Sequence, residues 1–199
     1  GIIDNPILEN DKFFSLASIG GFIDGWSLVI PKEHTYSMRK FFTDSAFVDI
    51  ANKMLKRIRD AYRKKSIIFE HGANHEGSIT ACGTNHAHLH IIPYEKSLLK
   101  QMFHDDSVQW IECKITDVER IVQKKEYWFY AENVVDIEDA KGYIHIIEKP
   151  ESQYFRRLLA EKEGYTKEYD YKCNLFLDKG EATYASLVKK YDEERTDSN

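Results

Sequence analysis

The sequence lacks three features that would each point to a particular class of protein. Its cysteines number only three, they lie far apart, and they form no C-x-x-C pair: Cys82, Cys113 and Cys173. This argues against a disulfide framework and favours a reduced, cytoplasmic setting. No apolar run is long enough to cross a bilayer, and residues 1–14 lack a secretory signal pattern, so we expect no membrane partner. The formal net charge of −5 gives no general attraction to nucleic acid.

The first half of the chain is predicted to contain four strands and one long helix. Apolar residues recur at helical spacing from Phe47 to Tyr62, with charged residues between them. The first two strands should form a hairpin through Asp24-Gly25, a strong turn dipeptide. A stretch rich in glycine, asparagine and serine at residues 70–85 indicates a loop. The strands are expected at residues 13–19, 26–30, 66–69 and 86–92.

The second half is predicted to mix short strands and helices. Aromatic and β-branched runs at residues 126–132 and 143–148 could pair as a hairpin. An amphipathic helix is expected at residues 152–163, with Ser152 placed to cap it. The other expected elements are a short helix at 97–103, a strand at 110–115, a helix at 117–124, a last helix at 182–191 and a frayed tail at 192–199.

The most informative stretch carries three histidines, His86, His88 and His90, which alternate with small or apolar residues. Successive side chains of a strand point to opposite faces, so the imidazoles should share one face and the apolar residues the other. Histidine can serve as nucleophile, acid, base or metal ligand near neutral pH. The pattern therefore predicts a strand with one face for packing and one for chemistry.

Metal binding is an alternative use of these histidines, because alternating imidazoles on one strand can hold Zn²⁺. No carboxylate is obviously placed to complete such a site. His71 and His75 also have ligand spacing, but only if their segment is helical, which Gly72 and Gly77 argue against. We therefore expect no metal site in the chain.

The pattern from His86 to Ile92 resembles the signature of the histidine triad (HIT) superfamily. Upstream, Gly-Trp-Ser-Leu-Val-Ile-Pro-Lys-Glu-His at residues 25–34 is similar to the family's segment of glycine, strand and Pro-Lys-x-His. Residues 69–72 and 82–86 resemble a bacterial branch of the superfamily. Residues 152–157 and 170–172 are similar, more weakly, to C-terminal extensions in that branch.

The resemblance implies a mechanism and a set of site residues. His88 would attack the α-phosphorus of a bound nucleotide to give a covalent nucleotidyl-histidine, with His86 and His90 as its catalytic partners. No metal or other cofactor is required by this scheme. The loop before the triad could cradle the phosphate through its backbone N–H groups and a hydroxyl. The residues implied at the nucleotide are His34, Gly83, Thr84, Asn85, Ser18 and Glu70.

Several positions depart from the pattern of the family. Trp26 stands where many members have histidine, and Ser18 stands where an asparagine often holds the ribose. Glu70 replaces an amide near the phosphates, and its carboxylate would repel them; it could instead orient a histidine. Cys82-Gly83 replaces a polar pair. These departures leave the substrate open.

The expected architecture is an α+β fold, a HIT-like antiparallel sheet with the long helix packed on it and a C-terminal α+β extension. Residues 1–96 would form the catalytic core, and residues 97–199 an extension packed on that core, since no low-complexity linker separates them. Two alternatives stay open for the oligomeric state. Family members often dimerise, so this chain could form a homodimer. The C-terminal extension could instead take the place of a partner subunit.

The leading functional hypothesis is a nucleotide hydrolase or nucleotidyltransferase that cleaves a phosphoanhydride or a phosphoramidate. A dinucleoside polyphosphate is one candidate substrate. Two alternatives stay open: a nucleotide-binding regulatory module without turnover, which the departures favour, and a metal-dependent hydrolase, which the alternating histidines permit.

Overall fold

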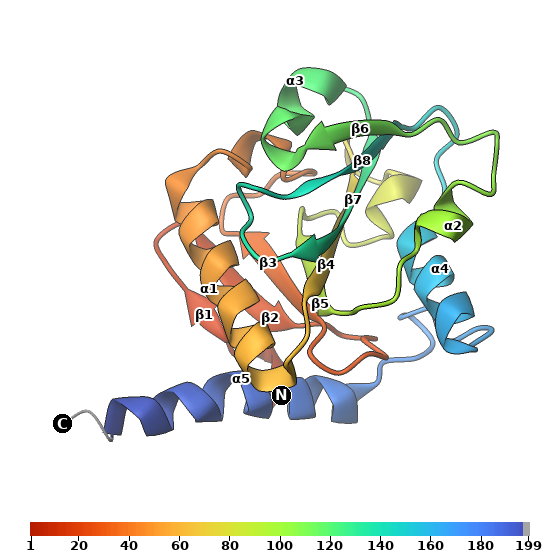
Figure 1. Cartoon of the computed structure of the whole chain (residues 1–199). Helices are drawn as coiled ribbons and strands as arrows, with labels where there is room; N and C mark the ends of the chain where they lie inside the picture. The colour runs from red at the N-terminus through yellow and green to blue at the C-terminus, as the bar shows by residue number, and fades with distance from the viewer. Residues whose placement is uncertain (197–199) are drawn as a thin grey trace.

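An eight-stranded sheet forms the centre of the molecule, and every neighbouring pair of strands is antiparallel (Figure 1). The computed structural model describes the backbone of residues 1–196 and the side chains of residues 1–188. The strand order is β1-β2-β3-β5-β4-β7-β8-β6. In that order the strands span Leu8–Glu9, Phe13–Ala17, Ser27–Pro31, Leu89–Pro93, Ser66–Gly72, Tyr127–Val134, Lys141–Ile146 and Ile111–Lys114. The predicted α+β class with an antiparallel sheet is confirmed.

Helix α1, Ser45–Tyr62, covers one face of the sheet. The Asp44 side chain accepts a hydrogen bond from the Ala46 N–H (2.8 Å) and so caps the helix, which ends where Arg63 takes a left-handed conformation at φ 56°. One stripe of α1 is buried on the sheet, as the helical spacing predicted: Phe47, Ile50, Ala51, Met54, Leu55 and Ile58. This core supports the strands from which the site is built.

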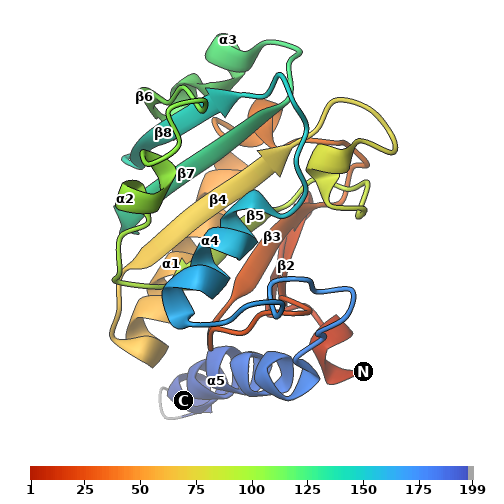
Figure 2. The same cartoon turned by 90° about the vertical axis from the view of Figure 1, so that its right-hand side faces the viewer.

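Helix α4, Tyr154–Glu163, covers the opposite face (Figure 2). The prediction that Ser152 caps it is wrong. Gln153 precedes the helix in a left-handed conformation and makes no side-chain cap. Instead, His71 Nε2 of β4 accepts the N–H of Phe155 (3.3 Å). A partner distant in sequence therefore satisfies a donor of the first turn, which local sequence could not indicate.

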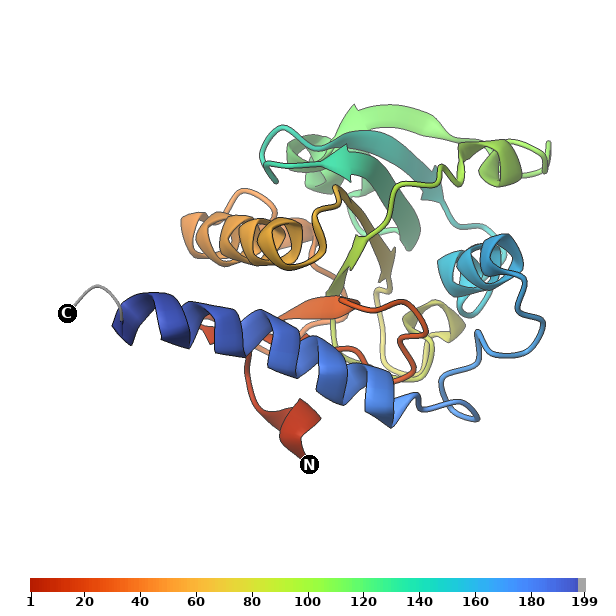
Figure 3. The same cartoon turned by 60° about the horizontal axis from the view of Figure 1, so that its bottom comes forward.

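Helix α5, Leu177–Thr196, begins earlier and ends later than the predicted helix at 182–191. It packs against α1, β2 and the N-terminal 3-10 turn Ile2–Asp4 (Figure 3). The predicted frayed tail is wrong as far as Thr196, because its glutamate and arginine residues are good helix formers. Residues 197–199 of that prediction lie outside the described residues.

The predicted strand pairings are confirmed, but several strand ends differ. Strands β2 and β3 pair, joined by a loop of residues 18–26 in which Asp24-Gly25 forms a turn closed from Trp26 N–H to Ile23 O (3.2 Å). Strands β7 and β8 form the predicted hairpin. Strand β4 runs on to Gly72, and β5 begins only at Leu89. The short helices are α2 (Leu99–Met102) and α3 (Val118–Val122), with 3-10 turns at Arg39–Phe41, Ile79–Ala81 and Ile115–Asp117.

The two halves of the chain share the sheet, since β7 pairs with β4 in a register that sets Phe69 opposite Tyr130. The division into a core of residues 1–96 and an extension of residues 97–199 stays a prediction.

None of the helices in the described part of the chain is both long and apolar enough to cross a membrane.

Candidate functional site

A cavity of about 390 Å³ opens on the α4 side of the sheet. Apolar side chains of β2 and β3 form part of its lining, and histidines form another part. The N-terminal turn, the loops that follow β2 and precede the triad, and the C-terminal half contribute the rest. We call it the histidine cavity. It is lined by Ile3, Asp4, Phe14, Leu16, Ala17, Ser18, Ile19, Leu28, Ile30, His71, Cys82, Thr84, His86, His88, His90, Arg156 and Tyr171.

The three alternating histidines all line this cavity. His86 and His88 lie just before β5, and His90 lies within it. The ring centroids of His88 and His90 are 4.7 Å apart. Leu89 and Ile91 point the other way and are fully buried in the core under α1. The predicted separation of the histidines from the apolar residues is confirmed, although only the last histidine is in the strand itself.

The environment of His88 leaves one of its ring nitrogens available. Nδ1 lies 3.0 Å from the backbone oxygen of His86. A carbonyl only accepts hydrogen bonds, so Nδ1 carries the proton and Nε2 keeps its lone pair. Removal from water lowers the pKa of His88, and the nearby Arg156 charge lowers it further, against the opposing effect of the bond to His86. His88 is therefore neutral at pH 7, with an unprotonated Nε2 and part of its surface open to the cavity.

Trp26 defines the state of His90. The indole Nε1–H donates to Nδ1 of His90 (2.9 Å), and both residues are buried. Indole is only a donor, so Nδ1 must be unprotonated and Nε2 must carry the proton. Burial holds the pKa of His90 well below its usual range, and the ring stacks on Phe69 with centroids 4.2 Å apart. His90 is thus a neutral, immobilised donor through Nε2–H.

Replacing Trp26 by phenylalanine is expected to release this tautomer. The variant leaves His90 Nδ1 without its donor, which should cost about 1–3 kcal/mol of stability. Nitrogen-15 NMR of the imidazoles measures the change: wild type should show only the Nε2–H form of His90, and the variant a mixture. Trp110→Phe is the matched control, because it removes an indole hydrogen bond to a backbone oxygen of Met102. A single unchanged tautomer in Trp26→Phe would contradict this assignment.

His71 is a fourth histidine of the site, and its role was not predicted. It lines the cavity from β4, and its Nε2 accepts the Phe155 N–H at the start of α4. Burial lowers the pKa of His71 to about 3, and the electrostatic effects of His88 and Arg156 lower it in the same direction. His75 is exposed and contacts Glu126, so His71 and His75 do not form a pair of metal ligands. Recognising that β4 continues to residue 72 would have placed His71 on the same face as Phe69.

The C-terminal half supplies one wall of the cavity through Arg156 and Tyr171. The Tyr171 hydroxyl donates to the backbone oxygen of Cys82 (2.7 Å), and the Gln153 N–H reaches the Cys82 sulfur (3.1 Å). Burial raises the pKa of the Cys82 thiol, so it serves packing and not nucleophilic attack. Arg157 points elsewhere and pairs with Glu151. The segment of residues 153–172 is therefore built into the site.

The residues predicted to bind a nucleotide occupy different places. Ser18 and Thr84 line the histidine cavity. Gly83 and Asn85 lie beside Thr84 in the loop before the triad, and the His34 ring lies edge-on to that of His86 with centroids 5.3 Å apart. Contact of these residues with a nucleotide stays a prediction.

Glu70 points to the opposite face of β4 from Phe69 and His71. It is 1% exposed and accepts hydrogen bonds from the Met38 N–H (2.5 Å) and the Tyr127 hydroxyl. Burial raises its pKa to about 7, although these hydrogen bonds oppose the shift. Glu70 therefore holds the chain near Met38 and is not among the residues that line the histidine cavity.

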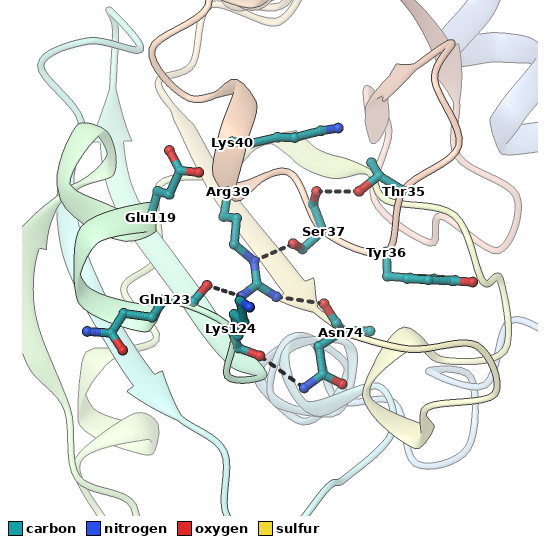
Figure 4. Close-up of a pocket in the computed structure, with 10 residues that line it drawn as sticks. Thr35, Tyr36, Ser37, Arg39, Lys40, Asn74, Glu119, Gln123 and Lys124 are labelled. Atoms are coloured by element: carbon teal, nitrogen blue, oxygen red, sulfur yellow. Dashed lines mark hydrogen bonds between the residues drawn. The ribbon is translucent and has the colours of Figure 1, made fainter.

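A second cavity, of about 480 Å³, lies beside the turn Arg39–Phe41 (Figure 4). Arg39 crosses it and joins three segments. Its Nη1 donates to the Gln123 backbone oxygen (2.5 Å) and its Nη2 to the Ala73 backbone oxygen (2.9 Å). Its Nε donates to the Ser37 hydroxyl (2.6 Å). The guanidinium there is committed to protein partners, which is the pattern of a structural cross-link.

Among the described residues, no group of three or more His, Cys, Asp or Glu side chains is arranged to hold a metal ion. In the histidine cavity, hydrogen bonds to protein occupy one nitrogen of His86, His88, His90 and His71 each.

Comparison with known proteins gives partial similarities. No protein-family model and no curated protein matches the chain. One similar solved structure is a Hit-like protein involved in cell-cycle regulation from Bartonella henselae, at 22% identity over 46% of this chain and 70% of that one, with a TM-score of 0.38. Another is a hypothetical histidine triad nucleotide-binding protein from Sulfolobus tokodaii, at 22% identity over 46% of this chain and 61% of that one, with a TM-score of 0.37.

Proposed function

We propose that this chain is a nucleotide hydrolase or nucleotidyltransferase in which His88 attacks the α-phosphorus of a nucleotide. The observation that carries this proposal is the state of His88. Its Nδ1–H is held by the His86 backbone oxygen, and its Nε2 is unprotonated at a cavity large enough for part of a nucleotide. The resemblance of residues 86–92 to the HIT signature supports the same role.

The proposed reaction has two displacements. In the first, the Nε2 lone pair forms a bond to the α-phosphorus, and the bond from phosphorus to the leaving group breaks, with that group taking the electron pair. The positive charge that develops on the His88 ring is stabilised by its Nδ1–H bond to the His86 oxygen. In the second, water or another acceptor forms a bond to phosphorus, the bond to Nε2 breaks, and neutral His88 is restored with loss of the acceptor's proton.

The neighbouring groups suit this chemistry. The Nε2–H of His90 is a fixed neutral donor for a phosphate oxygen or the leaving atom. The apolar side chains of β2 and β3, including Leu16 and Leu28, offer a surface for a base. The loop of residues 82–84 offers less than its sequence indicated, because the Cys82 and Thr84 N–H groups and the Thr84 hydroxyl already donate to backbone oxygens. The Gly83 N–H is the backbone donor of this loop that we propose for phosphate.

Turnover of paired adenylyl compounds tests this function. Diadenosine tetraphosphate and adenosine 5′-phosphoramidate share the adenylyl group and differ in the leaving group. We expect release of adenosine monophosphate from at least one of them, measured by liquid chromatography. Calorimetric binding of both compounds with no product after prolonged incubation would contradict the enzyme and indicate a binding module.

A further inference from the structure

Arg156 is a buried cation held by backbone oxygens. It is 3% exposed, and its Nε donates to the Tyr169 backbone oxygen (2.9 Å) while one terminal nitrogen donates to the Gly20 backbone oxygen. Its guanidinium lies 4.5 Å from the centroid of a Trp26 ring. Among the residues with described side chains, no carboxylate forms an ion pair with it. Burial lowers the pKa of Arg156, and the Asp170 carboxylate opposes this shift but forms no ion pair with it. Asp170 accepts hydrogen bonds from the Gln153 side chain and the Lys172 N–H instead. A buried charge without a contacting counter-ion is costly, so an anion is expected to match it.

The position of Arg156 indicates where that anion would bind. Arg156 lines the histidine cavity, and among the lining residues, all within the described part of the chain, it is the only lysine or arginine. Its charge lowers the pKa of His71, His88 and His90, so it lies near the histidines. The acidic residue of the lining, Asp4, belongs instead to the N-terminal turn.

Lys172 places a second cation next to the same site. A Cβ atom at Gly83 would lie 3.0 Å from its Nζ, so the ammonium rests on the loop that precedes the triad. Gly83 has φ +87°, so glycine allows both this backbone conformation and the close approach of Lys172. The Tyr171 bond to Cys82 fixes the adjoining segment to that loop. Arg156 therefore lines the cavity, and Lys172 lies beside it on the loop that precedes the triad.

We propose that Arg156 and Lys172 bind the phosphate chain of the substrate, and that the substrate is a phosphoanhydride with a multiply charged leaving group. This builds on the proposed function and narrows it to one of its two substrate classes. A guanidinium can bind two phosphate oxygens at once, and a lysine adds a point charge. A phosphoramidate carries charge only on its α-phosphate, which neutral donors such as His90 Nε2–H can bind, and its amine leaving group would gain nothing from two cations.

The test compares Arg156→Gln and Lys172→Gln with wild type on diadenosine tetraphosphate and on adenosine 5′-phosphoramidate. Loss of a charged hydrogen-bond partner should lower kcat/KM on the tetraphosphate about 10- to 100-fold. On the phosphoramidate the loss should be at least tenfold smaller. Arg156→Lys should restore part of the difference. Lys162→Gln is the matched control, because it removes an exposed charge from the same helix, and it should behave as wild type.

Equal losses on the two substrates, or no loss on either, would overturn the proposal. Arg156 also joins α4 to Gly20 and Tyr169, so thermal unfolding is measured for each variant. If Arg156→Gln does not fold, the exposed Lys172→Gln decides the question. If wild type turns over neither compound, the proposed function fails. In that case, equilibrium binding of the same two compounds is measured for wild type and the same variants. A selective loss of affinity for the tetraphosphate would support phosphate binding by the two cations. Affinities equal to those of wild type would refute it.

Discussion

Replacing His88 by alanine is expected to lower turnover of an adenylyl substrate by about 10⁴-fold or more. The substitution removes the only atom proposed to form a bond to phosphorus, Nε2, whereas the cavity and its other donors remain. The side chain is only half-buried, so the fold should tolerate its loss. Steady-state kinetics on purified protein, together with a thermal unfolding curve, measures both effects.

His75→Ala is the matched control, because His75 is exposed and lies outside the histidine cavity. It should retain the wild-type rate. If His88→Ala turns over every substrate as fast as wild type, covalent catalysis by His88 is wrong, whatever the effect of the neighbouring histidines.

Acidification is expected to destabilise the fold through its buried histidines. The folded-state pKa of His71 is about 3, below the ordinary value of 6.5, because burial disfavours its charged form. A depressed folded-state pKa means that stability is fully present above pH 6.5 and is lost as the pH falls toward 3. Each such histidine should contribute about 1.4 kcal/mol of lost stability per pH unit within that range. The lowered pKa values of His88 and His90 act in the same direction.

Chemical denaturation between pH 7 and pH 4 measures this slope. His71→Gln should make it shallower by about 1.4 kcal/mol per pH unit, because the amide oxygen can accept the Phe155 N–H but does not titrate. His75→Gln should leave it unchanged. Glu70 acts with the opposite sign, because its pKa is raised to about 7. Its contribution to the slope is the same in wild type and in both variants, so it does not affect the comparison. An identical slope in His71→Gln and wild type would show that His71 is not buried as a neutral ring.

Local patterns in the sequence predict a large part of this structure. The period of two around Leu89 and His90 places these side chains correctly, because one is drawn into the core under α1 and the other is left on the opposite face. The helical spacing from Phe47 to Tyr62 likewise predicts α1. The β7–β8 pair follows from its aromatic and β-branched residues.

Contacts between distant segments could not be predicted from those patterns. His71 enters the site because β4 pairs with β5 and runs on past Phe69, and its ring then caps a helix more than 80 residues away in sequence. The helical pattern of residues 152–163 does not distinguish a buried Arg156 from a solvated one, because its burial depends on packing against Trp26 and on hydrogen bonds to Gly20 and Tyr169. Trp26 itself marked a departure from the family pattern, but its hydrogen bond to His90 depends on the β3–β5 register.

Intact-mass spectrometry of the wild-type protein, quenched during turnover of diadenosine tetraphosphate, tests the role of His88 most directly. The account predicts a mass increase of one adenylyl group, mapped by peptide fragmentation to His88 and absent from His88→Ala. Product formation by wild type with no adduct at any quench time, or an adduct on another residue, would contradict it.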